Sequence, residues 1–310
     1  MPLPAVYMSP GGYWLNRRYD RMIYIMYNPL AGNSTCEETS KGVGAIFASD
    51  EKRYINLLEV EDFEGFVRDM DPEDQIIICG GDGTLNHLIN SINTSELEQD
   101  IFYYPCGSGN DFYHDIDEDK TNGVYRINMY LKCIPTVTIN GRKSLFINGI
   151  GYGIDGYCCE EGDKVRISKP GRRVNYPIIA FKGLVYDFHR VNAKVTVDGV
   201  TKEYRDVWMV PSMNGRYYGG GMMCAPNQDR LNEDGIVSVI IVHSKHRIPL
   251  LMAFSSIFKG KHLKYNRIIT EIKGSDVAVE FDRPTALQID GETVTGVTKY
   301  EVHKENKIIC

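Results

Sequence analysis

The chain has 310 residues, of which 43% are hydrophobic and 25% are charged, and it carries a formal net charge of −6. These values are ordinary for a globular protein, and the length predicts two domains. The negative charge argues against a general nucleic-acid-binding protein, which needs a basic surface, so no nucleic-acid partner is expected.

The cysteines and the apolar segments predict the compartment. The 8 cysteines include no CxxC pair, which indicates free thiols in a reducing environment. Residues 1–20 lack the continuous apolar core of a secretory signal. The longest apolar stretch, 248–258, is shorter than the roughly 20 residues of a membrane-spanning helix. We therefore expect a cytoplasmic protein.

The first part of the chain alternates between strand and helix patterns. Apolar residues at helical spacing, such as those from Phe63 to Met70, predict helices, and short apolar runs bounded by Gly, Pro or Asn predict strands. The elements expected here are a leader over 1–21, a strand over 22–27 ending at Asn28-Pro29, a loop over 30–34, a weak helix over 41–49, a strand over 54–58 and a helix over 63–70.

A glycine turn over 80–83 is the most informative stretch. An apolar run over 76–79 predicts a buried strand, and apolar residues from Leu85 to Ile92 at helical spacing predict a helix directly after the turn. A strand, a glycine turn and a helix together aim backbone N–H groups at an anion such as phosphate. Asp82 alone would repel phosphate, so it suggests a divalent cation. The alternative is a plain turn, for which Gly-Gly-Asp-Gly is equally suitable.

A second glycine turn follows the next strand. The apolar run over 101–104 leads into a turn over 105–112, which again carries an aspartate. Alternating strands and helices with such turns at the strand ends predict an open, mostly parallel α/β sheet over 22–130. Ligands bind sheets of this type at the carboxyl ends of the strands, where both turns are expected.

The composition changes after about residue 125, where short strand patterns with turn signals predominate. Only two helices are expected, near 178–188 and 248–258. This pattern predicts a β-sandwich domain over 131–295. The expected strands are 124–137, 144–150, 193–197, 206–210, 236–242, 267–272, 277–281 and 286–289.

Several motifs in one order make the chain resemble the diacylglycerol kinase catalytic-domain family, which includes bacterial soluble lipid kinases and sphingosine kinases. Any one of the motifs is weak, but the ordered set extends from residue 22 nearly to the end of the chain. The matching pieces are Asn28-Pro29 with Gly32-Asn33, 80–86, 105–112, 149–155, 219–222, Ala225-Pro226, Asp234-Gly235 and Asp290-Gly291-Glu292.

The resemblance implies a nucleotide-binding N-terminal domain, a β-sandwich C-terminal domain, and an active site in the cleft between them. It also implies that a terminal segment over 296–310 returns to the first domain. The implied activity is transfer of a phosphate from ATP, with Mg²⁺, to a lipid hydroxyl. The residues expected to hold the nucleotide are Asn28, Asn33, Gly80, Gly81, Asp82, Gly83, Thr84, Asn86, Ser108, Asn110 and Asp111.

Three carboxylates are the expected catalytic groups. Asp82 would act through Mg²⁺, which bridges phosphate oxygens. Asp290 is the expected general base for the acceptor hydroxyl, and Glu292 would lie beside the metal. Because an ordinary aspartate, with a pKa near 3.9, is a weak base for an alcohol, Asp290 would orient the hydroxyl and take its proton late. The alternative for this segment is a hairpin turn.

The resemblance implies a second, structural Mg²⁺ site. Its ligands would be the Asp234 carboxylate and the backbone carbonyls of Leu231 and Ile236. The alternative for these residues is also a hairpin turn.

The expected partner is a lipid hydroxyl acceptor, which the protein would reach by transient peripheral contact at the inner face of the membrane. Two basic segments are candidates for this membrane contact. The second of them, 245–247, precedes the apolar stretch 248–258, which we expect to be core. The sequence leaves the oligomeric state open; a homodimer is one candidate, because symmetric dimers are common. Two other functions stay open, an NAD kinase and a non-catalytic binding module. The first candidate for membrane contact is the basic cluster Lys164, Arg166, Lys169, Arg172 and Arg173, followed by Tyr176, Ile178 and Phe181.

Overall fold

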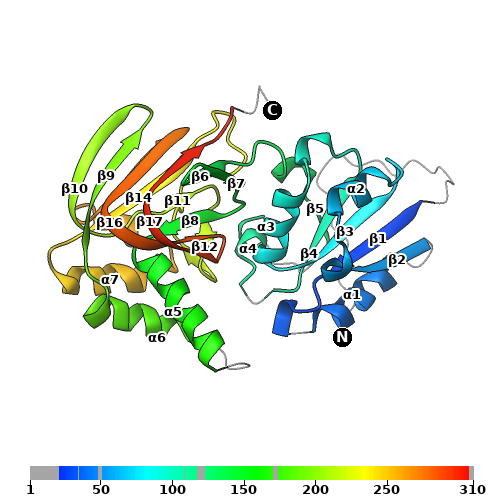
Figure 1. The fold of residues 1–310 in the computed structure, drawn as a ribbon, viewed down its shortest axis with the longest axis horizontal. Helices are drawn as coiled ribbons and strands as arrows, with labels where there is room; N and C mark the ends of the chain where they lie inside the picture. The colour runs from blue at the N-terminus through cyan, green and yellow to red at the C-terminus, as the bar shows by residue number, and fades with distance from the viewer. Residues whose placement is uncertain are drawn as a thin grey trace. The chain divides into compact units, whose positions relative to one another are not determined.

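The computed structural model divides the chain into two compact units, 1–132 and 133–310. Each unit has its own sheet and its own core (Figure 1). Residues 1–20, which include nearly all of the predicted leader, lie outside the residues that the structure describes. The described residues are 21–33, 35–47, 51–107, 109–116, 123–169 and 174–306.

The first unit is built on a five-stranded sheet in the order β2-β1-β3-β4-β5. β1 to β4 are parallel, and only β5 is antiparallel to its neighbour β4. All six residues of β3 are buried, as expected for the central strand of a covered parallel sheet. The prediction of an open, mostly parallel sheet is confirmed. The strands are β1 (Met22–Tyr27), β2 (Glu51–Asn56), β3 (Gln75–Gly80), β4 (Asp100–Pro105) and β5 (Tyr125–Arg126).

Helices connect these strands. The residues at the N-termini of α2 and α3 explain where these two helices begin. The Asp62 side chain accepts a hydrogen bond from the Gly65 N–H at 2.9 Å and so caps α2. α3 begins directly after the glycine turn and buries Leu85, Leu88 and Ile89, as predicted. The helices are α1 (Cys36–Gly44), α2 (Phe63–Arg68), α3 (Asp82–Ser91) and α4 (Asp111–Ile116), with short helices at η1 (Ala31–Asn33), η2 (Ala45–Phe47), η3 (Leu57–Glu59), η4 (Thr94–Glu96) and η5 (Asn128–Tyr130).

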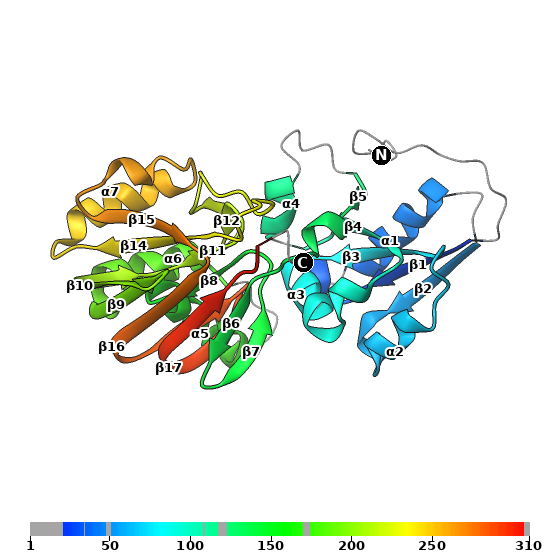
Figure 2. The same cartoon turned by 90° about the horizontal axis from the view of Figure 1, so that it is seen from above.

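The second unit contains a ten-stranded sheet whose described strands all pair antiparallel (Figure 2). β16 pairs with β9 through residues 277–281 and with β8 through 287–289, which closes the sheet on itself. The strands are β6 (Thr136–Ile139), β7 (Arg142–Leu145), β8 (Gly149–Tyr152), β9 (Val191–Val197), β10 (Val200–Met209), β11 (Ser212–Met213), β14 (Val237–His243), β15 (Ile269–Gly274), β16 (Asp276–Ile289) and β17 (Glu292–His303), with a separate pair β12 (Tyr217–Tyr218) and β13 (Met222–Met223).

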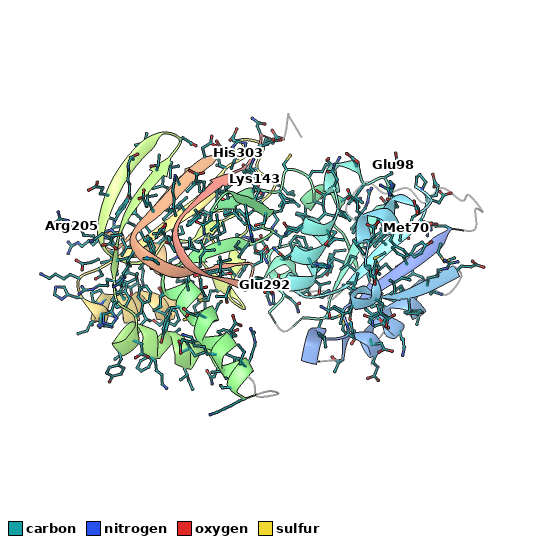
Figure 3. All side chains as sticks on the ribbon, viewed as in Figure 1. Met70, Glu98, Lys143, Arg205, Glu292 and His303 are labelled. Atoms are coloured by element: carbon teal, nitrogen blue, oxygen red, sulfur yellow. The ribbon has the colours of Figure 1, made fainter. Side chains whose placement is uncertain are left out.

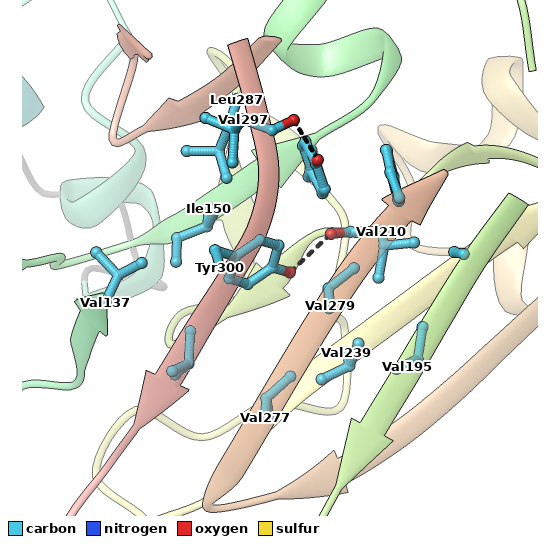
Figure 4. Close-up of a cluster of buried hydrophobic side chains, with 14 of the residues drawn as sticks. Val137, Ile150, Val195, Val210, Val239, Val277, Val279, Leu287, Val297 and Tyr300 are labelled. Carbon is cyan, nitrogen blue, oxygen red and sulfur yellow. Dashed lines mark hydrogen bonds between the residues drawn. The ribbon is translucent and has the colours of Figure 1, made fainter. Parts of the chain in front are cut away.

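The core of this sheet consists mainly of branched aliphatic side chains (Figure 4). Two buried tyrosines keep their hydroxyls paired with the backbone. The Tyr300 hydroxyl donates to the Val210 carbonyl at 3.0 Å, and the Tyr152 hydroxyl donates to the Val297 carbonyl at 2.6 Å. These bonds remove the cost of burying a hydroxyl, so both rings can fill the interior of the sheet.

Helix α5 (Ile154–Ser168) was not predicted. Its sequence, IDGYCCEEGDKVRIS, is polar on most sides and carries two glycines, so it lacks an apolar stripe. The helix is explained by its packing on β16. At Gly156 the two backbones are so close that a Cβ would lie 2.0 Å from the Ala286 carbonyl oxygen. The helix therefore approaches the sheet more closely than any other residue would allow. The other helices are α6 (Tyr176–Lys182), the π-helix η6 (Gly183–Asp187), α7 (Arg247–Ile257) and η7 (His262–Lys264).

Two other expectations need correction. Residues 296–303 lie in β17, which pairs with β16 and β6 of the second unit, so this part of the terminal segment does not join the first sheet. Residues 307–310 lie outside the described residues. Cys133 is disulfide-bonded, so the expectation of free thiols is wrong there. Within the described part of the chain, the free cysteines are Cys36, Cys79, Cys106, Cys158, Cys159 and Cys224.

Among the described residues, none of the helices combines the length and the apolar character that crossing a bilayer requires.

Candidate functional site

The loops that follow β1, β3 and β4 meet at the carboxyl edge of the first sheet. The Cys106 N–H donates to the Gly80 carbonyl at 2.7 Å, which joins the loop after β4 to that after β3. A Cβ on Gly107 would lie 2.5 Å from the Gly81 Cα, and a Cβ on Gly32 would lie 2.3 Å from the Cys106 carbonyl oxygen. The backbones are therefore in direct contact, which only glycine permits at these places.

Asp82 links the two predicted glycine turns. Its Oδ2 accepts the Asp111 N–H and its Oδ1 accepts the Phe112 N–H, each at 2.9 Å. Both donors belong to the first turn of α4, so the carboxylate caps α4 from the first residue of α3. The sequence suggested a metal role for Asp82 and did not reveal this capping role.

The Asn28 amide lies on the same edge. Its Nδ2 donates to the Thr84 hydroxyl at 3.4 Å, and its Oδ1 accepts the Leu30 N–H at 3.0 Å. Thr84 is buried, and a Cβ on Gly80 would lie 2.4 Å from its side chain. Asn28, Gly80 and Thr84, predicted separately from two motifs, are thus brought together.

Asn110 shapes the loop after β4. Its backbone has φ +51°, and its side chain accepts the Gly107 N–H at 2.9 Å and donates to the Gly107 carbonyl at 2.7 Å. Asn tolerates this left-handed conformation better than most residues. Asn110, which was predicted to contact the nucleotide, therefore has a structural role in the turn.

The remaining predicted nucleotide residues are placed as follows. Gly83 is exposed in the first turn of α3, where backbone N–H groups lack partners within the helix, and Asn86 is half-buried one turn later. Asn33 ends η1, but its side chain lies outside the described part of the chain, as does Ser108. The edge can bind an anion, because α3 directs N–H groups and the positive end of its dipole outward.

A cavity of about 420 Å³ opens at the same edge of the sheet. It lies where β2 ends, and Asn56 of β2 is in register with Tyr27 at the end of β1. This volume is in the range of small-molecule sites. The cavity is lined by Tyr54, Ile55, Asn56, Glu59, Val60, Glu61, Asp62 and Phe66.

We predict that Gly107→Ala will separate the two glycine turns. The new Cβ would collide with Gly81 and with the Asn110 Oδ1, 2.6 Å away. The free energy of unfolding should fall by about 1–3 kcal/mol, the usual cost of overpacking, and nucleotide binding should weaken. Chemical denaturation and ATP titration measure both effects. The control is Gly42→Ala in α1, where nothing lies within 4 Å of the new Cβ and the helix should gain stability.

In the second unit, Asp290 occupies the turn between β16 and β17. Its Oδ2 accepts the Ile147 N–H at 2.6 Å, and its Oδ1 accepts the N–H groups of Asn148 and Gly149 at 2.8 and 3.0 Å. Three N–H donors fix the orientation of the carboxylate. Glu292, the exposed first residue of β17, lies two positions further along the hairpin (Figure 3).

Arg230 supports the loop that holds Asp290. Its guanidinium donates to the Ile147 carbonyl and to the Asn148 Oδ1, each at 3.1 Å. The 147–149 loop therefore lies between the guanidinium and the carboxylate. Arg230 was not among the predicted site residues, because nothing in the local sequence pairs it with a loop more than 80 residues away.

Asp155, the last residue of the predicted motif 149–155, begins the first turn of α5. Its Oδ2 is buried and makes no hydrogen bond within the described part of the chain. Burial raises the pKa of Asp155 to about 7, and the Tyr218 hydroxyl acts in the opposite direction. The motif was recognised from its glycines, and the sequence assigned no role to this carboxyl group.

The raised pKa of Asp155 predicts how stability depends on pH. The folded protein keeps a proton that the unfolded chain releases near pH 4, so the free energy of unfolding should fall as the pH rises from about 4 to about 7. Asp155→Asn should remove this dependence and be the more stable protein at pH 8, by a few kcal/mol at most. Denaturation across this pH range tests it, with Asp234→Asn as the control for loss of one carboxylate. If the free energy of unfolding changed with pH in the same way in Asp155→Asn and in the wild type, the prediction would be wrong.

The residues predicted to hold a structural Mg²⁺ lie in a hydrogen-bonded turn. The Ile236 carbonyl already accepts Nε2 of Gln228 and Nδ2 of Asn232, each at 2.9 Å. The Asn232 Oδ1 also accepts the Ile236 N–H at 2.8 Å, which closes the turn. Asp234 is exposed beside it, and the Leu231 N–H donates to Asp229. Within the described residues, no three His, Cys, Asp or Glu side chains form a cluster that could hold a metal ion.

Comparison with known proteins agrees with both sheets. Residues 22–131 match the diacylglycerol kinase catalytic domain, and 148–303 match the YegS C-terminal NAD kinase beta sandwich-like domain. The chain is 26% identical over 251 residues to "Putative lipid kinase YtlR" of Bacillus subtilis (strain 168), covering 74% of this chain and 76% of that protein. It is 24% identical over 204 residues to "Diacylglycerol kinase" of Mycobacterium tuberculosis (strain H37Rv), covering 64% of each.

A solved structure shares the fold. The crystal structure of a "putative diacylglycerol kinase" from Bacillus anthracis str. Sterne superposes with a TM-score of 0.66 at 19% identity, over 97% of this chain and 96% of that one. The family matches cover the parallel sheet and the antiparallel sheet in turn, as the ordered motifs predicted. The chain belongs to the diacylglycerol kinase catalytic-domain family.

Proposed function

We propose that this protein is an ATP-dependent lipid kinase that transfers the γ-phosphate to the hydroxyl of a diacylglycerol-like lipid. The observation that carries the proposal is the clamp by which Asp82 joins the glycine turns after β3 and β4. The clamp fixes the first turn of α3, whose outward N–H groups suit the phosphates of a nucleotide. The cavity at the end of β2 is the proposed place for the rest of the nucleotide.

In the proposed reaction the acceptor oxygen forms a bond to the γ-phosphorus, and the bond from that phosphorus to the β–γ bridging oxygen breaks, which releases ADP. Catalysis of such a transfer consists mainly of positioning and charge neutralisation. Mg²⁺ bound with the nucleotide would neutralise phosphate charge. Asp290, which its three N–H partners hold in place, would orient the acceptor hydroxyl and take its proton late.

The test is transfer of labelled γ-phosphate from Mg·ATP to a panel of lipids in mixed micelles, with NAD as a parallel acceptor. Diacylglycerol, monoacylglycerol, phosphatidylglycerol, a sphingoid base and undecaprenol all present a hydroxyl near an apolar tail. We expect label on a glycerolipid and its loss in Asp290→Asn. Label on NAD would replace the proposal with an NAD kinase, and ATP binding without any transfer would favour a binding module.

A further inference from the structure

Helix α7 exposes apolar side chains on the face opposite the core. Leu250, Ala253 and Ile257 are buried in the second unit, as the expectation of a core helix requires. On the outer side, however, Ile248 is 73% exposed, Met252 57% and Phe258, at the C-cap, 48%. Large apolar side chains on both faces are unusual for a helix at a protein surface that only water contacts.

Neighbouring segments also carry exposed apolar side chains. α7 contacts η6, and η6 contacts α6. On these segments Ile178, Phe181 and Tyr186 are 52%, 55% and 73% exposed. Figure 1 shows α6 and α7 on the same side of the second unit. We call these six residues, Ile178, Phe181, Tyr186, Ile248, Met252 and Phe258, the outer apolar face.

The charge around α7 is one-sided. Residues 245–267 contain six lysines and arginines and no Asp or Glu, although the whole chain has a net charge of −6. Arg247 points inward, where it donates to the Leu184 carbonyl at 2.5 Å. Lys245 before the helix, and Lys259 and Lys261 after it, are exposed. Cations therefore lie at both ends of the exposed apolar stripe of α7.

We propose that the outer apolar face is the surface by which this protein docks on an anionic lipid bilayer. The apolar side chains would enter the boundary between headgroups and acyl chains, while the lysines would contact lipid phosphates. A second copy of the chain fits less well, because a symmetric dimer through α7 would bring like-charged lysines together. The inference rests on the proposed function, since a lipid kinase must reach its acceptor at a membrane.

The test is cosedimentation of the full chain with vesicles of equimolar phosphatidylglycerol and phosphatidylcholine, and with phosphatidylcholine alone. We expect binding to the anionic vesicles that weakens with salt. Ile248→Ser combined with Met252→Ser should reduce binding about tenfold or more, because two inserted side chains are lost. Lys259→Gln and Lys261→Gln should each reduce it about fivefold. The matched controls are Val200→Ser, at a 63% exposed position on β10, and Lys202→Gln on the same strand, which should bind as the wild type.

Equal binding by all variants, or a wild-type protein that ignores anionic vesicles, would overturn the docking surface. So would a concentration-dependent dimer of the wild type that the Ile248/Met252 variant loses, because a second copy would then cover the face. Phosphoryl transfer to a short-chain, water-soluble diacylglycerol distinguishes a wrong docking surface from a wrong kinase proposal, because this acceptor needs no membrane. The variants should act on that acceptor as the wild type does and fail only on vesicles. No transfer to the soluble acceptor by the wild type would instead count against the kinase proposal.

Discussion

Asp82→Asn is expected to lower phosphoryl transfer by about 100-fold or more and also to destabilise the first unit. An asparagine keeps one carbonyl oxygen but turns an NH₂ group toward the second backbone N–H of α4, so a hydrogen bond is replaced by two facing donors. Loss of a bond to a charged group in a half-buried place costs about 1–3 kcal/mol. The loops after β3 and β4 would then lose their shared orientation.

The measurement is the rate of γ-phosphate transfer as a function of Mg²⁺ concentration, together with chemical denaturation. The half-saturating Mg²⁺ concentration should rise in Asp82→Asn if the carboxylate also acts on the nucleotide-bound metal. An unchanged metal dependence with lowered stability would leave Asp82 with the capping role alone. Asp69→Asn is the matched control, because Asp69 is an exposed aspartate of the same unit at the end of α2.

Asp290→Asn should reduce phosphoryl transfer by about 10²- to 10⁴-fold, the usual contribution of a general base. It should also lower the free energy of unfolding by about 1–3 kcal/mol, because the Asn amide cannot accept all three N–H groups that the carboxylate now binds. Both effects are measured on the same preparation, by transfer from labelled ATP and by denaturation.

Glu292→Gln separates catalysis from stability. Glu292 is exposed at the start of β17, so its replacement should change the free energy of unfolding by less than about 0.5 kcal/mol. A lower transfer rate in this variant would place the carboxylate in the reaction. If Asp290→Asn kept the wild-type rate, the proposed mechanism would be wrong whatever its stability.

Most elements of the first unit could be predicted because they carry a local signal, but α4 was not predicted as a helix. The apolar run before Gly80 and the helical spacing after it are short-range patterns, and they gave β3 and α3 correctly. Helix α5 was missed for the opposite reason. Its helical state depends on Gly156 packing against β16, which lies 130 residues away in the sequence, and no local periodicity announces such a contact.

The candidate site could likewise be predicted only where the sequence carries a local signal. Glycines and aspartates in turns could be predicted from the motifs, because backbone conformation limits which residues fit. The partners of Asp82 and Asp290 could not be predicted, because they are backbone N–H groups, which any sequence supplies. The partners of the Ile236 carbonyl, which are the side-chain amides of Gln228 and Asn232, could not be predicted either.

The double pairing of β16 has a consequence for motion. One flank of this strand is hydrogen-bonded to β17, and the other is bonded first to β9 and then to β8. Residues 287–289 are paired on both flanks, so their amide protons should exchange with solvent far more slowly than those of the exposed residues 282–284, which lie outside both ladders. Asp290 follows directly on this strand. Its backbone is therefore anchored by the doubly paired end of β16, and the carboxylate should keep its three donors for as long as that end stays folded.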